Sequence, residues 1–194
     1  LHNNRHSFPT RRSSDLHPTG SPVTAYRDPD STDWRANRVA AALAGRNPTV
    51  LAELDHAFAV IGDVQFLPGY SLALTKVPGV DRLTDLPRAQ RLGFLADVDL
   101  IAAAVETVCA ARDPAYRRVN VEILGNNDAF LHAHIWPRYG WEPPELVGKP
   151  VWLYAAQRWG DPESALGPAH EGLRRALTTE IARLRALGEF AAPW

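Results

Sequence analysis

Two histidines, His132 and His134, stand at alternate positions in the short apolar segment 130–138. Side chains alternate along a strand, so both imidazoles are predicted to lie on one face, about 7 Å apart. Phe130 and Trp136 share that face. Neutral imidazole is a nucleophile near pH 7, and imidazolium donates hydrogen bonds to phosphate oxygens. The pattern is therefore suited to cleavage of a phosphate ester.

Two other interpretations of this pair remain open. The histidines could be structural, with ring nitrogens satisfied by the backbone, or they could be ligands of one metal ion. A cupin-like metal site requires a glutamate soon after His134, where Arg138 stands instead. The nearest glutamate, Glu142, follows a glycine beyond the strand, and His56 and His170 have no recognisable ligand spacing. The metal interpretation is therefore the weaker one.

The remaining pattern predicts an α+β fold, a single domain with an antiparallel sheet and helices on one side. Hydrophobic alternation and turn residues predict strands at 50–54, 57–61, 70–77, 118–124, 129–138 and 151–155. Helical periodicity and end signals predict helices at 34–45, 85–112 and 166–187.

The long helix at 85–112 is predicted to cover the sheet face that does not carry the histidines. Its apolar stripe consists of Leu92, Leu95, Val98, Ile101, Ala102, Val105 and Val108. The matching apolar positions of the histidine strand are Leu131, Ala133 and Ile135. Asp85 is its expected N-cap, while Ser31, Thr32 or Asp33 would cap the first helix and Gly45 would end it.

Composition excludes several classes of function. The chain has 194 residues, a net charge of -1 and a pI near 6.7, so it has no basic field for nucleic acid or an anionic membrane. No apolar run approaches the roughly 20 residues of a membrane-spanning helix. The single cysteine, Cys109, excludes an internal disulfide and fits a reducing compartment. We therefore expect a cytoplasmic protein.

The first 33 residues are set apart from the domain. Residues 7–16 back-translate as TCT TTC CCT ACA CGA CGC TCT TCC GAT CT, which resembles a short-read sequencing adapter. A basic disordered arm and a targeting peptide are the alternatives, although the segment lacks the apolar core of a secretory signal. We interpret 1–16 as a disordered adapter artefact, 17–33 as a flexible leader, and 34–194 as the domain with a C-terminal helical extension.

The segments 120–126 (NVEILGN) and 130–139 (FLHAHIWPRY) resemble the signature hairpin of the histidine triad (HIT) superfamily, which reads His-φ-His-φ-His-φ-φ and often ends in Pro-Arg. The similarity is greatest to bacterial diadenosine tetraphosphate hydrolase-like proteins. Earlier in the chain, Asp63, the segment 68–72 (PGYSL) and Lys76 resemble the first conserved block of this family. The resemblance covers residues 50–139 and does not explain 140–194.

The resemblance implies separate roles for His132 and His134 once they are aligned with the three histidines of the family signature. Pro137 lies three residues after His134, as the family's proline follows its third histidine, so His132 is the middle one. The resemblance then implies that His132 attacks the α-phosphate and forms a nucleotidyl-histidine intermediate, while His134 contacts phosphate oxygen. A frame shifted by two would instead make His134 the nucleophile and Trp136 the third residue.

Further nucleotide-binding positions follow from the same resemblance. Asp63 matches the acidic residue that binds the ribose hydroxyls, and Asn126 matches a phosphate-side glutamine, with Asn127 beside it. Asn120 matches an asparagine near the ribose or nucleophile. Lys76 is a further candidate for phosphate.

Two substitutions depart from the family pattern. Phe130 replaces the first histidine, and Tyr70 replaces the histidine of the first block. Phenylalanine can only pack, whereas the tyrosine hydroxyl can donate a hydrogen bond to imidazole or phosphate. Both leave the predicted nucleophile in place, but they leave open whether activity is normal, slow or lost.

Three functions are therefore compared: a HIT-type nucleotide hydrolase or nucleotidyl transferase, a catalytically weak nucleotide-binding or sensing protein, and a His-x-His metal enzyme. The first needs no cofactor for the nucleophilic step, although a divalent metal could accompany the nucleotide. The resemblance also implies a homodimer. Trp152, Tyr154 and Trp159 are candidates for an adenine pocket, with core or subunit packing as the alternative.

Overall fold

The computed structural model describes residues 33–190, so the interpretations of 1–16 and 17–32 lie outside the described residues. The helices are α1 (Arg38–Leu43), α2 (Arg88–Arg112), α3 (Ala156–Trp159) and α4 (Glu171–Leu187). The strands are β1 (Val50–Glu53), β2 (Ala57–Ile61), β3 (Ser71–Thr75), β4 (Tyr116–Glu122) and β5 (His132–Tyr139). Short 3₁₀ helices occur at Leu83–Asp85, Val151–Leu153, Pro162–Ser164 and Pro168–His170.

The strands form one antiparallel sheet in the order β1-β2-β3-β5-β4. Leu74 pairs with His132 and Leu72 with His134, so β3 lies directly beside the histidine strand. On its other side, Glu122 pairs with His134. The predicted α+β class with an antiparallel sheet is therefore confirmed, with β5 in the interior of the sheet.

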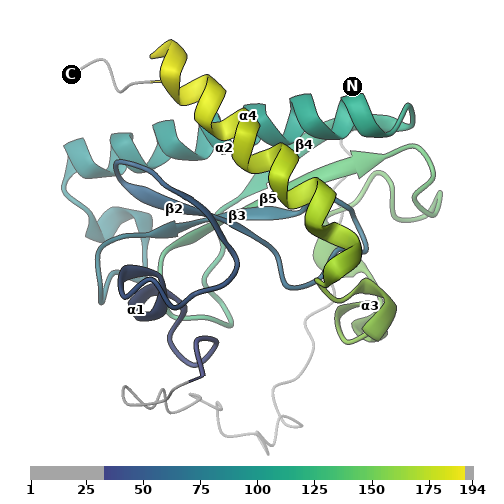
Figure 1. The fold of residues 1–194 in the computed structure, drawn as a ribbon. Helices are drawn as coiled ribbons and strands as arrows, with labels where there is room; N and C mark the ends of the chain where they lie inside the picture. The colour runs from purple at the N-terminus through teal and green to yellow at the C-terminus, as the bar shows by residue number, and fades with distance from the viewer. Residues whose placement is uncertain (1–32, 191–194) are drawn as a thin grey trace, which may run out of the picture.

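Helices α2 and α4 pack together over one face of the sheet, and α1 lies on the opposite side of the strands (Figure 1). Leu131, Ala133 and Ile135 of the histidine strand are fully buried in the core beneath α2, as predicted. Phe130 belongs to a second, smaller cluster on the α1 side. The histidine face of β5 is thus left to form a pocket.

The long helix differs from prediction at its start and in one member of its stripe. It begins at Arg88 because Pro87 and the residue before it are extended, which leaves Asp85 in a separate 3₁₀ turn. Phe94 is fully buried, whereas Leu95 lies on the exposed side. The core face therefore runs through positions 94, 98, 101, 105 and 108.

The ends of four predicted strands, at 50–54, 70–77, 118–124 and 129–138, shift by up to three residues. Three further predicted elements need a larger correction. The first helix starts only at Arg38, because the Asn37 side chain accepts the Ala40 N–H as the N-cap, and Gly45 follows its end at a φ of 66° as predicted. The last helix begins at Glu171, because Gly167 and Pro168 open a 3₁₀ turn. The strand predicted at 151–155 is a 3₁₀ helix after Pro150, which has no N–H for a sheet ladder.

Candidate active site

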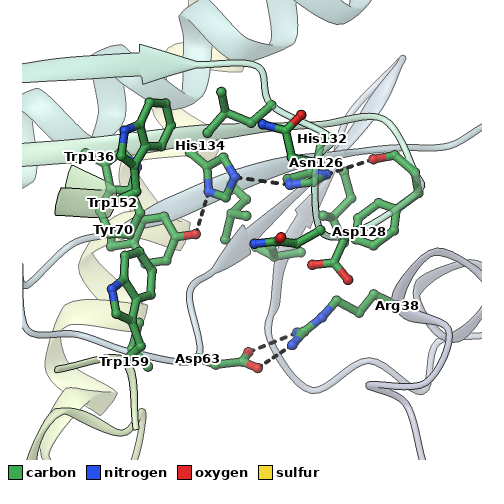
Figure 2. Close-up of a pocket in the computed structure, with 18 of the residues that line it drawn as sticks. Arg38, Asp63, Tyr70, Asn126, Asp128, His132, His134, Trp136, Trp152 and Trp159 are labelled. Atoms are coloured by element: carbon green, nitrogen blue, oxygen red, sulfur yellow. Dashed lines mark hydrogen bonds and ion pairs between the residues drawn. The ribbon is translucent and has the colours of Figure 1, made fainter. Parts of the chain in front are cut away.

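The face of β5 that carries the histidines opens into a pocket of about 920 Å³. His132 and His134 form its upper wall in Figure 2, with Tyr70 and Trp136 beside them. Arg38 and the loop that connects β4 to β5 complete other walls. This volume lies in the range typical of small-molecule sites.

A backbone hydrogen bond fixes the protonation pattern of His132. Its Nδ1 lies 2.8 Å from the carbonyl oxygen of Phe130, and a carbonyl can only accept. Nδ1 therefore carries a hydrogen, and neutral His132 has its lone pair on Nε2. Phe130 thus orients His132 through its backbone, while its ring packs in the smaller core cluster as expected.

The Nε2 atoms of His132 and His134 are 3.1 Å apart, and the Tyr70 hydroxyl lies 2.7 Å from Nδ1 of His134. If both rings are neutral, His134 must provide the hydrogen between the two Nε2 atoms, because His132 has only a lone pair there. Nδ1 of His134 must then accept the Tyr70 O–H. The chain of hydrogen bonds therefore runs from Tyr70 through His134 and His132 to the Phe130 carbonyl.

The environment keeps His134 and Tyr70 neutral near pH 7. Burial, with a smaller contribution from neighbouring His132, lowers the pKa of His134 to about 4. Burial raises the pKa of Tyr70, and the negative charge of Asp63 raises it further. His134 is thus a neutral hydrogen-bond donor at Nε2, and Tyr70 keeps its hydroxyl proton.

Tyr70 is held in place by ring stacking and by a glycine. Its ring is parallel to that of Trp136, with centroids 3.4 Å apart and planes 6° apart. A Cβ at Gly62 would lie 2.1 Å from the Tyr70 ring, so a larger residue there would displace the tyrosine. Gly62 therefore provides the space that lets Tyr70 reach His134.

Asp63 lines the pocket, but its carboxylate is already paired. Arg38 donates to both oxygens, at 3.1 and 2.5 Å, and Arg35 approaches to 3.7 Å (Figure 2). Both guanidinium groups lie over the Trp34 ring. Arg38 is the one lysine or arginine among the described residues that line this pocket.

The sequence reasoning missed Arg38, which lies before the region of family resemblance. The only signal was its position in the helix predicted at 34–45, which does not indicate that its side chain reaches a pocket formed by distant strands.

The loop between β4 and β5 places Asn126 and Asn127, two of the residues predicted to bind nucleotide, on the pocket. Asp128 from the same loop also lines it and points toward Arg38 in Figure 2. Two predicted nucleotide-binding residues do not line the pocket. Asn120 pairs in register with Trp136 farther along β4, on the edge of the sheet. Lys76 is engaged elsewhere, with Glu53 at 2.7 Å and the Leu54 carbonyl at 2.9 Å.

The chain after Tyr139 contributes an aromatic wall. Trp152 and Trp159 both line the pocket, whereas Tyr154 is buried beside it and donates to Glu142. Trp159 meets Trp136 nearly perpendicularly, with ring centroids 5.7 Å apart. Two of the three aromatic candidates therefore reach the cavity.

A buried ion pair attaches this segment to the histidine strand. Arg138 donates to both carboxylate oxygens of Glu142 at 2.8 to 3.0 Å, and to three backbone carbonyls between residues 146 and 149. Arg138 is thus a structural residue in this protein, and it is not available to bind phosphate.

The remaining histidines and cysteine lie outside the candidate site. His56 packs against Gly93 of α2, and His170 accepts the Gly167 N–H. Burial raises the pKa of the Cys109 thiol, which fits a core position. Between residues 33 and 190, no group of three or more histidine, cysteine, aspartate or glutamate side chains is placed to hold a metal ion. No helix in that range is long and apolar enough to cross a membrane.

Comparison with solved structures identifies the fold. A histidine triad protein from Marinobacter aquaeolei aligns with a TM-score of 0.55 and 19% identity over 70% of this chain and 89% of its own. A histidine triad protein from Sinorhizobium meliloti aligns with a TM-score of 0.55 and 16% identity, and the alignment covers 73% of this chain and 93% of the other. A hypothetical histidine triad nucleotide-binding protein from Sulfolobus tokodaii aligns with a TM-score of 0.56 and 13% identity, and the alignment covers 80% of this chain and 97% of the other.

These similarities show that the protein has the histidine triad fold. At the level of sequence, no family model and no curated protein matches the chain.

Proposed function

We propose that this protein is a nucleotide hydrolase or nucleotidyl transferase that uses His132 as its nucleophile. The observation that carries the proposal is the direction of the hydrogen-bond chain. The Phe130 carbonyl holds Nδ1 of His132 protonated and leaves the lone pair on Nε2, facing His134 in the pocket. His134, with its N–H at Nε2, is a donor rather than a nucleophile, which favours the frame anchored at Pro137 over the shifted one.

The reaction has two steps. In the first, Nε2 of His132 attacks the α-phosphorus, a P–N bond forms, and the P–O bond to the leaving group breaks with its electron pair. In the second, the oxygen of water forms a new P–O bond, the P–N bond breaks, and Nε2 regains its lone pair. One water proton passes to the solvent or to a phosphate oxygen. An alcohol or phosphate in place of water would make the protein a transferase.

His134 stabilises charge in this mechanism without giving up its proton. Its N–H, which donates to His132 in the free protein, turns to a phosphate oxygen as the nucleophile attacks. Donation of the proton itself would require either an imidazolate or a Tyr70 phenolate, and burial disfavours both charged forms. The site therefore suits a leaving group that needs no proton, such as the phosphate of a dinucleoside polyphosphate.

Asn126 and Asn127 are the proposed contacts for phosphate oxygens, since both side chains line the pocket. Asp63 is the proposed contact for the ribose hydroxyls, with Arg38 bound to the same carboxylate. The site therefore offers the ribose an ion pair instead of a free carboxylate.

The test is a His132→Ala variant assayed with diadenosine tetraphosphate and a panel of nucleotide anhydrides. We expect the release of nucleoside monophosphate to be lost while the far-ultraviolet circular dichroism stays unchanged. Intact-mass measurement after brief incubation should show a nucleotidyl adduct on the wild type and none on the variant. His170→Ala, which changes a histidine outside the pocket, is the matched control. Full activity in His132→Ala would contradict the mechanism.

A second function, nucleotide binding with little turnover, is favoured by one specific contact. In the free protein the Nε2–H of His134 donates a hydrogen bond to the lone pair on Nε2 of His132. His132 must therefore lose this hydrogen bond before its Nε2 can attack a phosphate. Saturable binding without monophosphate release across the panel would support this function. Adduct formation would exclude it.

Metal binding is the third candidate. The Nε2 atoms of His132 and His134 converge, and one solved structure of this fold, from Mycobacterium smegmatis, is described as zinc-bound. Stoichiometric metal in the purified protein, lost on His132→Ala and on His134→Ala, would support this alternative.

A further inference from the structure

Two tryptophans from the segment after β5 form one side of the pocket, and the reaction outlined above gives them no role. Trp152 lies in the 3₁₀ helix Val151–Leu153, and Trp159 ends α3. Figure 2 shows both on the side of the cavity occupied by Tyr70 and Trp136. Trp159 contacts Trp136, whose ring in turn lies parallel to that of His134.

The backbone that carries Trp152 is anchored on both sides of the indole. Val151 is fully buried in the core, and Tyr154 is buried with its hydroxyl 2.8 Å from Glu142. Farther on, Leu166 N–H donates to the Asp63 carbonyl and Gln65 N–H to the Ser164 carbonyl. The segment is therefore attached at both ends, and Trp152 is presented from a fixed turn.

Trp152 nevertheless remains 46% exposed. Within residues 33–190 its ring has no aromatic partner, and its indole N–H has no hydrogen-bond acceptor. Burial of a tryptophan side chain contributes strongly to the free energy of unfolding. A rigid turn that leaves a tryptophan exposed at a pocket therefore lacks that stabilisation. An exposed indole held in this way is suited to stacking against a planar ring of a ligand.

Trp159 differs in that it is half-buried and braced. Phe66 contacts it with ring centroids 5.2 Å apart and planes at 79°, and Trp136 does so at 5.7 Å and 88°. Such edge-on contacts fix the orientation of the indole. The wall thus combines one braced ring and one accessible ring.

We propose that Trp152 and Trp159 form the base subsite of this protein, with the nucleobase stacked on Trp152 and the α-phosphate at His132. This inference rests on the proposed function and names the part of the chain that selects the substrate. Stacking on an indole recognises the flat ring of a base and not its hydrogen-bonding groups. Adenine and guanine should therefore bind about equally, and the smaller pyrimidines more weakly.

The experiment compares ligands with and without a base, measured by isothermal titration calorimetry at equal ionic strength. The probes are adenosine 5′-monophosphate and ribose 5-phosphate, bound to the wild type, Trp152→Ala, Trp159→Leu and Trp141→Ala. Trp141 is the matched control, because it is 49% exposed but stacks on Tyr139 and donates to Asp113 outside the pocket.

We expect Trp152→Ala to weaken binding of the nucleotide about tenfold while changing that of ribose 5-phosphate less than about twofold. Trp159→Leu should act in the same direction, and Trp141→Ala should have no effect. Equal losses for both ligands, or equal affinity of the wild type for both, would overturn the base subsite.

Two further outcomes separate the inference from its alternatives. Sedimentation that changes from dimer to monomer in Trp152→Ala, with nucleotide affinity unaltered, would identify a contact between copies and overturn the subsite. Base-dependent binding that persists in a protein without turnover would support the subsite while contradicting the catalytic proposal.

Discussion

The Tyr70 hydroxyl lies 2.7 Å from Nδ1 of His134, on the opposite side of that imidazole from His132. Because Tyr70 donates there, His134 carries its proton at Nε2 and directs it toward Nε2 of His132. A hydroxyl thus occupies the position at which the family pattern has a histidine. Its high pKa makes it a fixed donor, which holds one tautomer of His134 instead of supplying protons.

Tyr70→Phe tests this positioning role. The variant keeps the ring that stacks on Trp136 and removes only the hydroxyl, so Nδ1 of His134 is left without its donor. We expect kcat to fall about 10- to 100-fold with little change in KM, since a lost buried hydrogen bond costs about 1–3 kcal/mol. Nitrogen NMR of labelled histidine should show that His134 no longer occupies a single tautomer.

Tyr116→Phe is the control for that experiment. The Tyr116 hydroxyl is buried without a hydrogen-bond partner in the described part of the chain, and it does not line the pocket. Its removal should leave kcat and the His134 tautomer unchanged. Equal activity of the two phenylalanine variants would contradict the role of Tyr70.

The lowered pKa of His134 predicts a dependence of stability on pH. In the unfolded chain the imidazole titrates near 6.5, and in the folded protein near 4. Between these values the unfolded state binds more protons, so the free energy of unfolding falls as pH decreases from about 6.5 to 4. The loss from this group is up to about 3 kcal/mol.

Urea unfolding of the wild type and His134→Asn at several pH values measures that loss. The difference between the two proteins should shift by this amount across the window and stay constant above pH 7. A difference independent of pH would show that His134 titrates normally in the folded protein.

Arg38→Met tests whether the arginine on the pocket wall serves anion binding. The change removes the one lysine or arginine among the described lining residues and leaves Asp63 with Arg35 alone. Nucleotide affinity should fall about tenfold, because the described lining of the pocket loses the positive charge that attracts the phosphates. The loss should be larger for nucleoside triphosphates than for monophosphates.

Arg185→Met, which breaks the exposed pair between Arg185 and Asp55, is the matched control and should leave affinity unchanged. Tighter nucleotide binding in Arg38→Met would mean that Arg38 blocks the ribose-binding carboxylate instead of assisting the phosphate.

Glu142→Gln tests the anchor of the aromatic segment. The variant leaves the buried Arg138 guanidinium without its counter-charge, which costs about 3–5 kcal/mol of unfolding free energy. Glu180→Gln removes the partner of exposed Arg183 and should leave the denaturation midpoint nearly unchanged. Similar midpoints for both variants would contradict the structural importance of the buried pair.

The parts of the site that sequence predicted are those with short-range periodicity. Alternation along β5 placed His132 and His134 on one face and Ile135 on the other, and the structure has this arrangement. Asn126 was found through the resemblance of its hairpin to the histidine triad signature. In these cases neighbours in space are neighbours in sequence.

The parts that sequence missed depend on tertiary contacts. Arg38 reaches the pocket because α1 packs against β2 and β3. Lys76 does not line the pocket, and its ammonium group pairs instead with Glu53 at the end of β1. The sequence has no periodic pattern that indicates which residue a long charged side chain, such as that of Arg38 or Lys76, will contact.

Gly62 has a consequence that extends beyond the ring it accommodates. Its backbone N–H donates to the Tyr70 carbonyl, and the absent side chain leaves the space that the Tyr70 ring fills. A single added methyl group would therefore tilt the tyrosine, break its contact with His134 and free the imidazole to change tautomer. The tautomer of His134, and with it the hydrogen bond to Nε2 of His132, thus depends on the absence of a side chain at Gly62, the residue that follows β2.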